Sequence, residues 1–573
     1  MPTRVLGINN YVHDSSVALI EDGKVVFAVA EERLSRIRKD RGFPKLGIAA
    51  ALADRGIEFQ DLDAVAFGWN KPPATQLHTL LSSLRGQLPR SLPFIAHSLA
   101  GIPREIYDGI GKRDLQHLFG NVEPIYIDHH EAHAWSAYAL SGFDEATVVV
   151  MDGRGARQAT TIYHAQGQTL RRIRQINYPN SLGAFYEGFT DLLGFERHSD
   201  EWKVMGLAAY GEPVVDLSNC IRIGKDGYRI NAQLLIGRWW GDIAALEREF
   251  GPRRNPEHLT QADRDLAASV QHALEQAVFA VVRGAVAATG CRKVCLAGGV
   301  AMNSKANGRL LASGIVDDLF VQPAATDDGT AVGAALAAHG HIGLEIPRYR
   351  QDEAYWGPGF TNDEITAALR TFKLRSFEVP NIERQAAQLL AEGNVIGWFQ
   401  GRMEFGPRAL GNRSILADPR RAEMKDRVNE AVKFREGWRP FAPSCLAEHA
   451  SEFFAGCSDA PFMILCFDVL PEAAPLIPAV THADGTARVQ TVTREANPRY
   501  RELIRQFAAI TGVPVVLNTS FNLRGEPIVC TPKDAIRTFY SSGLDFLVLG
   551  DHVVAKDPVW RPAQPEERVA VGV

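Results

Sequence analysis

Residues 4–30, RVLGINNYVHDSSVALIEDGKVVFAVA, place a polar loop and a hairpin signal between apolar runs. The first run, at 4–10, predicts a strand, and the loop after it carries His13 and Asp14. An Asp-Gly pair at 22–23 separates the two later apolar runs, which is a strong signal for a β-hairpin. The stretch therefore predicts a strand, a polar loop and a hairpin in succession.

The same pattern recurs at 147–176, where TVVVMD predicts a strand, GRGARQ a polar glycine loop, and ATTIYH and TLRRIRQI a second hairpin. A unit that occurs twice indicates an internal duplication. Duplicated units with an acidic polar loop after the first strand are similar to the actin and hexokinase-like ATPase fold, in which the two loops face each other across a nucleotide cleft. An ordinary α/β protein remains the alternative, because hairpins with polar loops are common in that class.

The chain has 573 residues, more than one hydrophobic core usually serves, so at least two domains are expected. Residues 341–361 combine proline, glycine and charge without a period, which is typical of a connector. Beyond them, helical segments at 362–372 and 382–392 lead into the strand VIGWFQG. We predict an α/β domain at 1–345, a linker at 346–361 and an α+β domain at 362–573.

The composition, with 46% hydrophobic and 23% charged residues, is that of a soluble globular protein. The net charge of −5 provides no electrostatic footprint for duplex DNA or long RNA, so no nucleic-acid partner is expected. The 7 cysteines include no Cys-x-x-Cys pair, and the N-terminus lacks the layout of a signal peptide. No apolar run reaches the roughly 18 residues that span a bilayer. We expect a reduced, cytoplasmic protein without a membrane partner.

A pair of histidines is the first candidate for a metal site. The segment DHHEAHAWSAYALSG at 128–142 predicts a helix with an aspartate as its N-cap. His129 and His133 would project from one face of this helix about one turn apart, a spacing that suits two ligands of one transition metal. Taken alone, such a pair more often belongs to a core or a surface.

Carboxylates that converge on the histidines would strengthen the metal interpretation. Asp152 ends the first strand of the second repeat, and Asp327 lies on a glycine turn before a helix. Two imidazoles with one or two carboxylates match Fe(II), Zn(II) or Mn(II). Asp328 is the less favoured neighbour and is interpreted as a helix cap.

The turn GGVAMN at 298–303 follows a predicted buried strand, a placement that lets backbone approach a nucleotide. A Gly-Gly turn alone is unspecific. The chain contains neither Gly-x-x-x-x-Gly-Lys-Ser/Thr nor Gly-x-Gly-x-x-Gly, so a P-loop and a dinucleotide-binding motif have no support.

Basic residues cluster in the second predicted domain, at Arg402, Arg408, Arg413, Lys433, Arg435, Arg439, Arg488, Arg499 and Arg524. They stand among apolar residues such as Phe405, Trp438 and Phe441, which are poor companions for a solvated surface. Buried guanidinium groups need anionic partners, and a clustered set suits phosphate, which accepts bidentate bonds from arginine. We interpret the cluster as an anion site rather than as a set of structural ion pairs.

With these motifs laid out, the sequence resembles, over nearly its whole length, the O-carbamoyltransferase family of antibiotic and nodulation-factor biosynthesis. The resemblance is carried by HDSSVAL (13–19), HHEAHA (129–134), MDGRG (151–155), KVMGLAAYG (203–211), GGVAMN (298–303), TDDGTAVG (326–333), GRMEFGPRALGNRS (401–414), KFREGWRPFAPS (433–444), HADGTARVQ (482–490) and LNTSFN (517–522). It implies an actin-like N-terminal domain similar to tRNA threonylcarbamoyl-transferring enzymes. It also implies a C-terminal domain similar to the YrdC-type enzymes that form threonylcarbamoyl-adenylate.

The resemblance also implies roles for individual residues. The implied metal ligands are His129, His133, Asp152 and Asp327. The residues implied around carbamoyl phosphate and ATP are Arg408, Lys433, Arg439 and Arg488, with hydroxyl groups from Thr519 and Ser520. Those implied around the adenylate in the N-terminal cleft are Lys203, Gly298, Gly299 and Asn303.

The implied activity is an ATP-dependent carbamoyl transfer. Carbamoyl phosphate loses phosphate, and the carbamate attacks the α-phosphate of Mg-ATP in the C-terminal domain to form carbamoyl-adenylate. Both steps build negative charge that arginine and lysine stabilise. In the N-terminal domain a metal, Fe(II) favoured over Zn(II) or Mn(II), would orient the carbonyl while a hydroxyl of a small-molecule natural product attacks. His13 is the candidate base, with Asp14 as its orienting partner or substitute.

Two other functions compete with this one. A tRNA threonylcarbamoyladenosine-type modifying enzyme would need a basic patch interleaved with exposed aromatics, which the sequence lacks. An actin-like ATPase switch leaves the histidine pair and the arginine-rich domain without a role. The acceptor stays unidentified, with its pocket expected in 70–120 and 176–260. The oligomeric state is also open, a homodimer being the arrangement to test.

Overall fold

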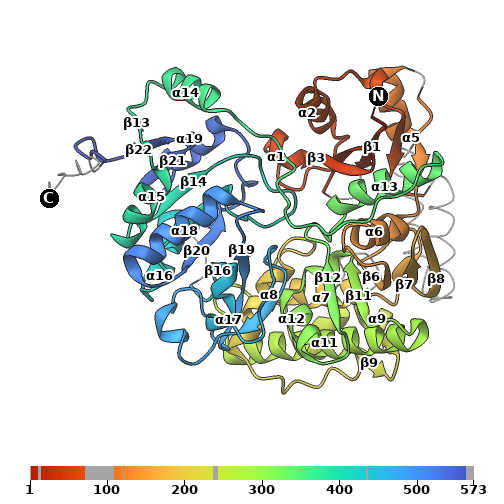
Figure 1. The fold of residues 1–573 in the computed structure, drawn as a ribbon. Helices are drawn as coiled ribbons and strands as arrows, with labels where there is room; N and C mark the ends of the chain where they lie inside the picture. The colour runs from red at the N-terminus through yellow and green to blue at the C-terminus, as the bar shows by residue number, and fades with distance from the viewer. Residues whose placement is uncertain are drawn as a thin grey trace.

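The computed structural model describes residues 2–10, 14–70, 109–120, 122–235, 243–433 and 437–562. Figure 1 shows the C-terminal part of the chain, in blue and blue-green, beside the N-terminal part, in red to green. The N-terminal part contains two five-stranded sheets, and the C-terminal part contains one eight-stranded sheet. Among the described residues, no helix combines the length and the apolar character that crossing a membrane requires.

The first sheet has the strand order β3-β2-β1-β4-β5. β1 (Arg4–Asn9) pairs antiparallel with β2 (Ser16–Glu21), which pairs antiparallel with β3 (Lys24–Ala30). β4 (Ala64–Phe67) and β5 (Ile125–Tyr126) extend the sheet as parallel strands on the other side of β1. The strand, loop and hairpin predicted at 4–30 are confirmed.

The second sheet repeats this arrangement, with the order β8-β7-β6-β11-β12. β6 (Glu145–Met151) pairs antiparallel with β7 (Gln158–Gln166), which pairs antiparallel with β8 (Thr169–Asn177). β11 (Lys293–Ala297) and β12 (Asp318–Val321) are the parallel strands. In both sheets the first strand of the unit is central, with its hairpin on one side and two parallel strands on the other. The predicted duplication and the actin/hexokinase-like fold are confirmed.

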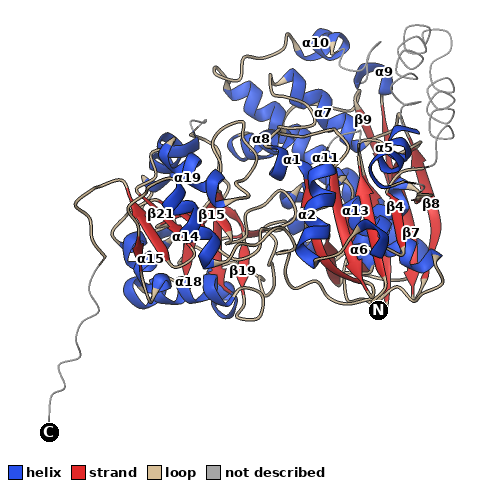
Figure 2. Cartoon of the chain, turned by 90° about the horizontal axis from the view of Figure 1, so that it is seen from above, coloured by secondary structure: helices blue, strands red, loops and turns tan. Residues whose placement is uncertain are grey.

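Two helices pack closely against each other and against these two sheets. α6 (His129–Tyr138) packs against α13 (Asp328–His341) (Figure 2). α13 also contacts β1. A Cβ atom on Gly333 would overlap the backbone carbonyl of Ala132, and one on Gly7 would overlap that of Ala331. The glycines therefore permit an approach of backbone to backbone that no other residue allows, and this approach brings the start of α13 to the histidines of α6.

Replacing Gly333 with Ala is expected to destabilise the fold, although alanine favours helix by about 1 kcal/mol. The new Cβ must push α13 away from the Ala132 carbonyl. Overpacking of this kind costs about 1–3 kcal/mol or more and outweighs the gain in propensity. Thermal unfolding should show a lower midpoint for the variant. Gly224→Ala is the matched control, because its nearest neighbour atom would lie 3.6 Å away, and a lower midpoint there would contradict the steric argument.

α11 (Gln261–Thr289) is the long helix predicted at 263–289. It begins with a capping box in which the Thr260 and Asp263 side chains each accept the backbone N–H of the other. It ends at Gly290, whose φ of 78° is the left-handed conformation typical of a helix C-terminus. α11 contacts the shorter α7 (Leu182–Leu192) and α8 (Glu201–Leu207), so it supports the elements that line the site described below.

The remaining elements of the N-terminal part are short. The helices are α1 (Glu31–Ser35), α2 (Lys45–Arg55), α5 (Gly109–Phe119), α9 (Ala232–Leu235), α10 (Ala244–Phe250) and α12 (Ser304–Ala312). A separate two-stranded sheet consists of β9 (Ile221–Gly224) and β10 (Gly227–Ile230). The predicted connector contains no helix or strand between residues 343 and 360, all of which are described.

The C-terminal part is α+β, as predicted. Its mixed sheet consists, in spatial order, of β13 (Phe377–Glu378), β22 (His552–Ala555), β21 (Phe546–Leu549), β14 (Ile396–Phe399), β15 (Arg413–Ala417), β20 (Val515–Ser520), β16 (Ala442–Leu446) and β19 (Gln490–Val492). Its longer helices are α14 (Asn362–Thr371), α15 (Ile382–Ala391), α18 (Pro498–Thr511) and α19 (Pro532–Tyr540). α14 and α15 match the helical segments expected from the sequence.

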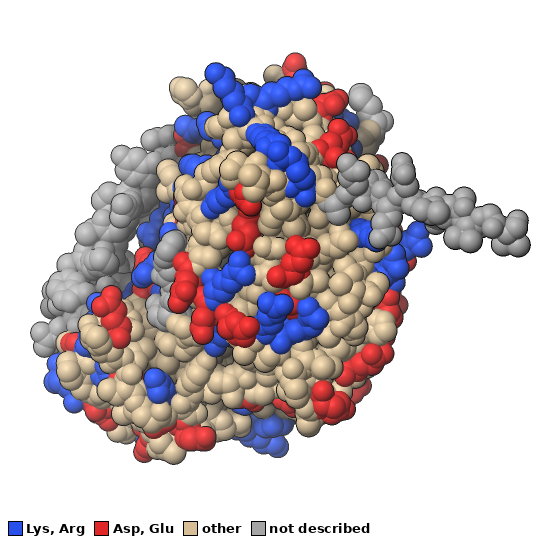
Figure 3. Space-filling model, turned by 90° about the vertical axis from the view of Figure 1, so that its left-hand side faces the viewer, with Lys and Arg blue, Asp and Glu red and all other residues tan. Residues whose placement is uncertain are grey.

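The two parts of the chain are packed together through α12. A small sheet of β17 (Cys466–Asp468) and β18 (Thr486–Arg488) lies against this helix. A Cβ atom on Gly308 of α12 would overlap the Cys466 carbonyl, and the Asn307 side chain donates a 3.0 Å hydrogen bond to the Ile464 carbonyl. The outer face of the C-terminal part carries acidic and basic side chains interspersed (Figure 3).

Candidate active site

Four buried side chains converge where the two repeats of the N-terminal part meet. His129 and His133 lie on α6, Asp152 directly follows β6, and Asp327 directly precedes α13. His129 Nε2 is 3.6 Å from Asp152 Oδ2 and 3.6 Å from Asp327 Oδ1, and His133 Nε2 is 3.7 Å from Asp327 Oδ1. One ligand atom from each residue lies within 4.8 Å of those of the other three. We call this group the His–Asp cluster.

The His–Asp cluster fits a divalent transition metal. The Nε2 atoms of both histidines are buried and have no hydrogen-bond partner among the described residues. The other ring nitrogen of His129 is 3.0 Å from the Gly68 carbonyl, so a proton there leaves the Nε2 lone pair directed at the carboxylates. Tetrahedral ligands about 2.1 Å from one ion are about 3.4 Å apart, close to the observed separations.

The electrostatics of the cluster favour a bound cation. Burial alone would lower the pKa of His129, but the negative charges of Asp327 and Asp152 raise it to about 10, so the two carboxylates favour a positive charge here that a proton or a metal ion can supply. By contrast, burial lowers the pKa of His130 to about 3, and its Nδ1 is 2.8 Å from Thr161 Oγ1. His130 Nδ1 is thus engaged with Thr161, and the residue is not part of the cluster.

Backbone geometry orients the two carboxylates. Asp327 occupies the N-cap position of α13, yet its side chain makes no capping hydrogen bond and instead approaches the histidines. Asp328 is the first residue of the helix, so its interpretation as a cap is wrong. Gly299 donates its N–H to Asp152 Oδ1 at 3.0 Å, and Gly298 passes Met151 so closely that a Cβ would overlap its carbonyl. The Gly-Gly turn thus holds a carboxylate of the cluster.

A cavity of about 1520 Å³ extends into the C-terminal part from Asp152, the member of the cluster that lines it, and we call it the central cavity. Its N-terminal wall includes Asp14, Asp152, Lys203, Gly299 and Asn303. Its C-terminal wall includes Arg408, Arg439, Arg488, Thr519 and Ser520. Residues predicted from the sequence for two separate steps therefore face one shared space.

Two neighbouring guanidinium groups make the C-terminal wall of the cavity positively charged. Burial lowers the pKa of Arg408 well below its usual value, and the charge of Arg488 lowers it further. Burial also lowers the pKa of Arg488. The Nε atoms of both are buried without a hydrogen-bond partner in the described part of the chain. Two adjacent buried cations attract an anion strongly. Together with Arg439, which lines the same cavity, we call them the anion site.

For three other arginines the interpretation as an anion site is wrong. Arg402 Nη1 forms a 3.0 Å ion pair with Asp54, and Arg499 pairs with Glu383 and Asp551. The buried Arg413 stacks on the Phe399 ring, with 3.7 Å from Cζ to the ring centre, and donates to backbone carbonyls. These three side chains hold the fold together, whereas Arg524 also lines the central cavity.

Some predicted site residues, or their side chains, fall outside the described residues. His13 and Arg435 fall outside the described residues. Lys433 ends a π-helical turn, Asn429–Lys433, and its side chain also falls outside the described part. Asp14 is described, adopts a φ of 59° and lines the central cavity. The segment 70–120, where acceptor contacts were expected, is largely outside as well.

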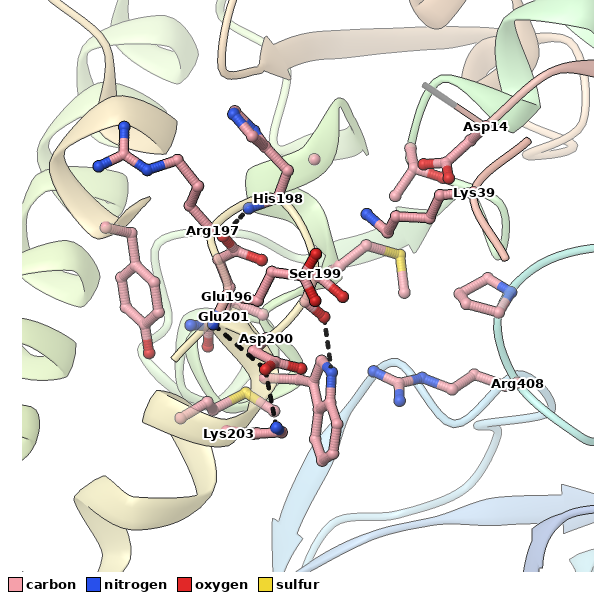
Figure 4. A pocket seen from close by; sticks show the side chains of 18 of the residues that line it. Asp14, Lys39, Glu196, Arg197, His198, Ser199, Asp200, Glu201, Lys203 and Arg408 are labelled. Atoms are coloured by element: carbon pink, nitrogen blue, oxygen red, sulfur yellow. Dashed lines mark hydrogen bonds and ion pairs between the residues drawn. The ribbon is translucent and has the colours of Figure 1, made fainter. Parts of the chain in front are cut away.

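Residues 196–203, ERHSDEWK, line the central cavity and fall within 176–260, one of the two segments in which acceptor contacts were expected, although only Lys203 was named as a site residue. Figure 4 shows 196–201 and Lys203 across the pocket from Asp14 and Arg408. Lys203 Nζ is 2.7 Å from Asp200 Oδ2. Burial and the charge of Glu187 raise the pKa of Glu201 to about 7. A polar run between helices has the composition of a solvated loop, so its pattern carried no signal for a cavity wall.

Comparison with known proteins points to one family. Residues 4–336 match the family model described as Carbamoyltransferase N-terminus, and residues 387–556 match Carbamoyltransferase C-terminus. The chain is 40% identical to the nodulation protein NolNO of Sinorhizobium fredii, over 98% of this chain and 81% of that protein. It is 45% identical to the nodulation protein NolO of Bradyrhizobium diazoefficiens, over 75% and 79%. It is also 41% identical to the Synechocystis protein sll1178, over 98% of both chains.

Proposed function

The chain belongs to the carbamoyltransferase family, and we propose that it is an ATP-dependent O-carbamoyltransferase with two half-reactions in one cavity. Carbamoyl-adenylate forms in the C-terminal domain (362–573), and the carbamoyl group then passes to a hydroxyl of a small-molecule natural product in the N-terminal domain (1–345). The observation that carries the proposal is the central cavity of about 1520 Å³, which is lined both by the anion site and by Asp152 of the His–Asp cluster.

In the first half-reaction, carbamoyl phosphate is hydrolysed to carbamate and inorganic phosphate. A carbamate oxygen then attacks the α-phosphate of Mg-ATP, and pyrophosphate leaves. Arg408, Arg439 and Arg488 bind the phosphate oxygens, and their preorganised charge stabilises the negative charge that builds up in both steps. Thr519 and Ser520 supply hydroxyl donors on the same wall. Lys433 is assigned here by its position in the family motif.

In the second half-reaction, the acceptor oxygen attacks the carbamoyl carbon and AMP leaves. The proposed metal ligands are His129, His133, Asp152 and Asp327. A divalent ion held there, Fe(II) favoured over Zn(II) or Mn(II), supplies Lewis-acid polarisation and a template. The acceptor proton passes to His13, with Asp14 as orienting partner or substitute. The proposed contacts of the adenylate are Lys203, Gly298, Gly299 and Asn303.

The shared cavity has a chemical rationale. Carbamoyl-adenylate is a mixed anhydride that water hydrolyses readily, so an enclosed path between the two steps protects it. Gly299 illustrates how the backbone contributes, because its N–H holds an Asp152 oxygen while the residue also lines the cavity. Gly298 does not line the cavity, so its proposed contribution is to shape this turn.

Pyrophosphate release that depends on carbamoyl phosphate tests the proposal. With purified protein, Mg-ATP and carbamoyl phosphate, we expect pyrophosphate to form, and omission of carbamoyl phosphate or the change Arg439→Ala should abolish it. The physical reason is that attack of carbamate on the α-phosphate splits ATP between the α- and β-phosphates, whereas an ATPase switch splits it between the β- and γ-phosphates. Hydrolysis of ATP to ADP, without pyrophosphate and without a requirement for carbamoyl phosphate, would reject the proposal in favour of an ATPase switch.

A further inference from the structure

Arg439, in the C-terminal part, rests on an aromatic side chain of the N-terminal part. Its guanidinium carbon lies 3.8 Å from the centre of the Trp202 ring on α8. Tryptophan is the aromatic residue that attracts a cation most strongly. Trp202 is itself held in place, because its indole N–H donates a 2.9 Å hydrogen bond to the Ser199 carbonyl.

A second contact across the two parts involves Tyr210, which ends the turn of helix after α8 (Ala208–Tyr210). Its hydroxyl donates to the carbonyl of Trp438, the residue before Arg439, at 3.0 Å. It also accepts a 3.3 Å hydrogen bond from Lys425 Nζ, and Lys425 lines the central cavity. One hydroxyl therefore fixes the backbone next to Arg439 and an ammonium group on the same cavity wall.

The segment 438–440 packs against the N-terminal part on both sides of Arg439. The ring centres of Trp438 and Phe195 are 6.1 Å apart in an edge-on arrangement. A Cβ atom on Gly206 of α8 would meet Pro440 at 3.4 Å and Trp438 at 3.5 Å, so the segment lies in van der Waals contact with the helix. α8 and Tyr210 thus contact the backbone on both sides of Arg439.

We propose that Trp202 and Tyr210 are positioning residues for the anion site. They hold Arg439 and Lys425 in the geometry that binds the phosphate of carbamoyl phosphate, so formation of the adenylate depends on contacts from the N-terminal part. This inference rests on the proposed function. Stacking engages the face of a guanidinium, whereas phosphate binds its in-plane N–H groups, so the two contacts do not compete for the same surface. It also removes side-chain freedom that a flexible arginine would otherwise lose on binding.

Calorimetric titration with carbamoyl phosphate tests the inference without requiring turnover. Trp202→Leu removes the aromatic face and should weaken binding about tenfold, whereas Trp202→Phe keeps a ring and should retain most of the affinity. Tyr210→Phe deletes only the hydroxyl and should weaken binding about fivefold. Tyr540→Phe is the matched control, since Tyr540 is 49% exposed and does not line the cavity, and it should bind as the wild type does.

The outcomes separate this inference from the proposed function. Equal affinities of wild type, Trp202→Leu and Tyr210→Phe, with unchanged unfolding midpoints, would overturn the inference, as would a wild type that binds no carbamoyl phosphate. If Trp202→Leu fails to fold, the comparison of Trp202→Phe and Tyr210→Phe with the control decides. A different result would be that the wild type binds carbamoyl phosphate and the variants bind it more weakly as expected, while the wild type releases no pyrophosphate. This result would reject the adenylate chemistry and leave the positioning role standing.

Discussion

Arg408→Ala is expected to lower carbamoyl phosphate-dependent pyrophosphate release about 10²–10³-fold, the usual effect of removing one preorganised donor from a developing negative charge. Its guanidinium is buried beside that of Arg488 on the cavity wall. Each bound phosphate relieves the repulsion between the two cations, so the energetic value of Arg408 is greatest when an anion is present. Steady-state assays at varied carbamoyl phosphate should show the loss in kcat/KM.

The same variant should unfold at an equal or higher temperature than the wild type when no ligand is present. The buried positive charges of Arg408 and Arg488 repel each other, and the change to alanine removes that repulsion together with a desolvated cation. Arg402→Ala is the control, because Arg402 pairs with Asp54 and does not line the cavity. It should leave pyrophosphate release within about threefold, as expected when a partly exposed ion pair is lost. Loss of stability in Arg408→Ala with retained activity would mean that Arg408 is structural.

The fold was predictable because its signals are local. The Asp22-Gly23 hairpin and the apolar runs around it follow from turn chemistry and strand alternation, and their recurrence at 147–176 revealed the duplication. The His–Asp cluster was also predictable in its members, since helical spacing places His129 and His133 on one face and a strand end presents Asp152. Helix caps were less predictable, because tertiary contact decides whether a carboxylate near a helix start caps it.

Which arginines line the cavity and which form structural contacts was not predictable, because this depends on partners far away in sequence. Arg402 and its partner Asp54 are separated by 348 residues, and Arg499 and Asp551 by 52. No local pattern distinguishes them from Arg408, which lies six residues from Arg402 and meets another cation instead. Within 176–260, where acceptor contacts were expected, residues 196–203 could not be singled out for the same reason, since residues across the cavity from them lie in the C-terminal part.

His133→Ala should remove the metal and stop carbamoyl transfer while leaving the release of pyrophosphate in the first turnover largely intact. His133 Nε2 is buried, has no hydrogen-bond partner among the described residues and faces Asp327 Oδ1 at 3.7 Å. Loss of an outer partner of a metal ligand already weakens metal binding about 10–100-fold, so loss of a direct ligand should weaken it at least that much. Metal content after gel filtration and pyrophosphate release are the two readouts.

His130→Gln is the matched control for this prediction. His130 is buried on the same helix, but its ring contacts Thr161 and lies outside the cluster, so the variant should retain metal. Under the proposed mechanism the two half-reactions would use opposite walls of the central cavity, because the anion site belongs to the C-terminal part and the cluster to the N-terminal part. One result would be that the His133→Ala protein lacks metal and still releases pyrophosphate, while it forms AMP no faster than the adenylate hydrolyses spontaneously. That result would place the metal in the transfer step. Equal loss of pyrophosphate release would instead mean that the cluster serves adenylate formation, and the division of labour between the walls would be wrong.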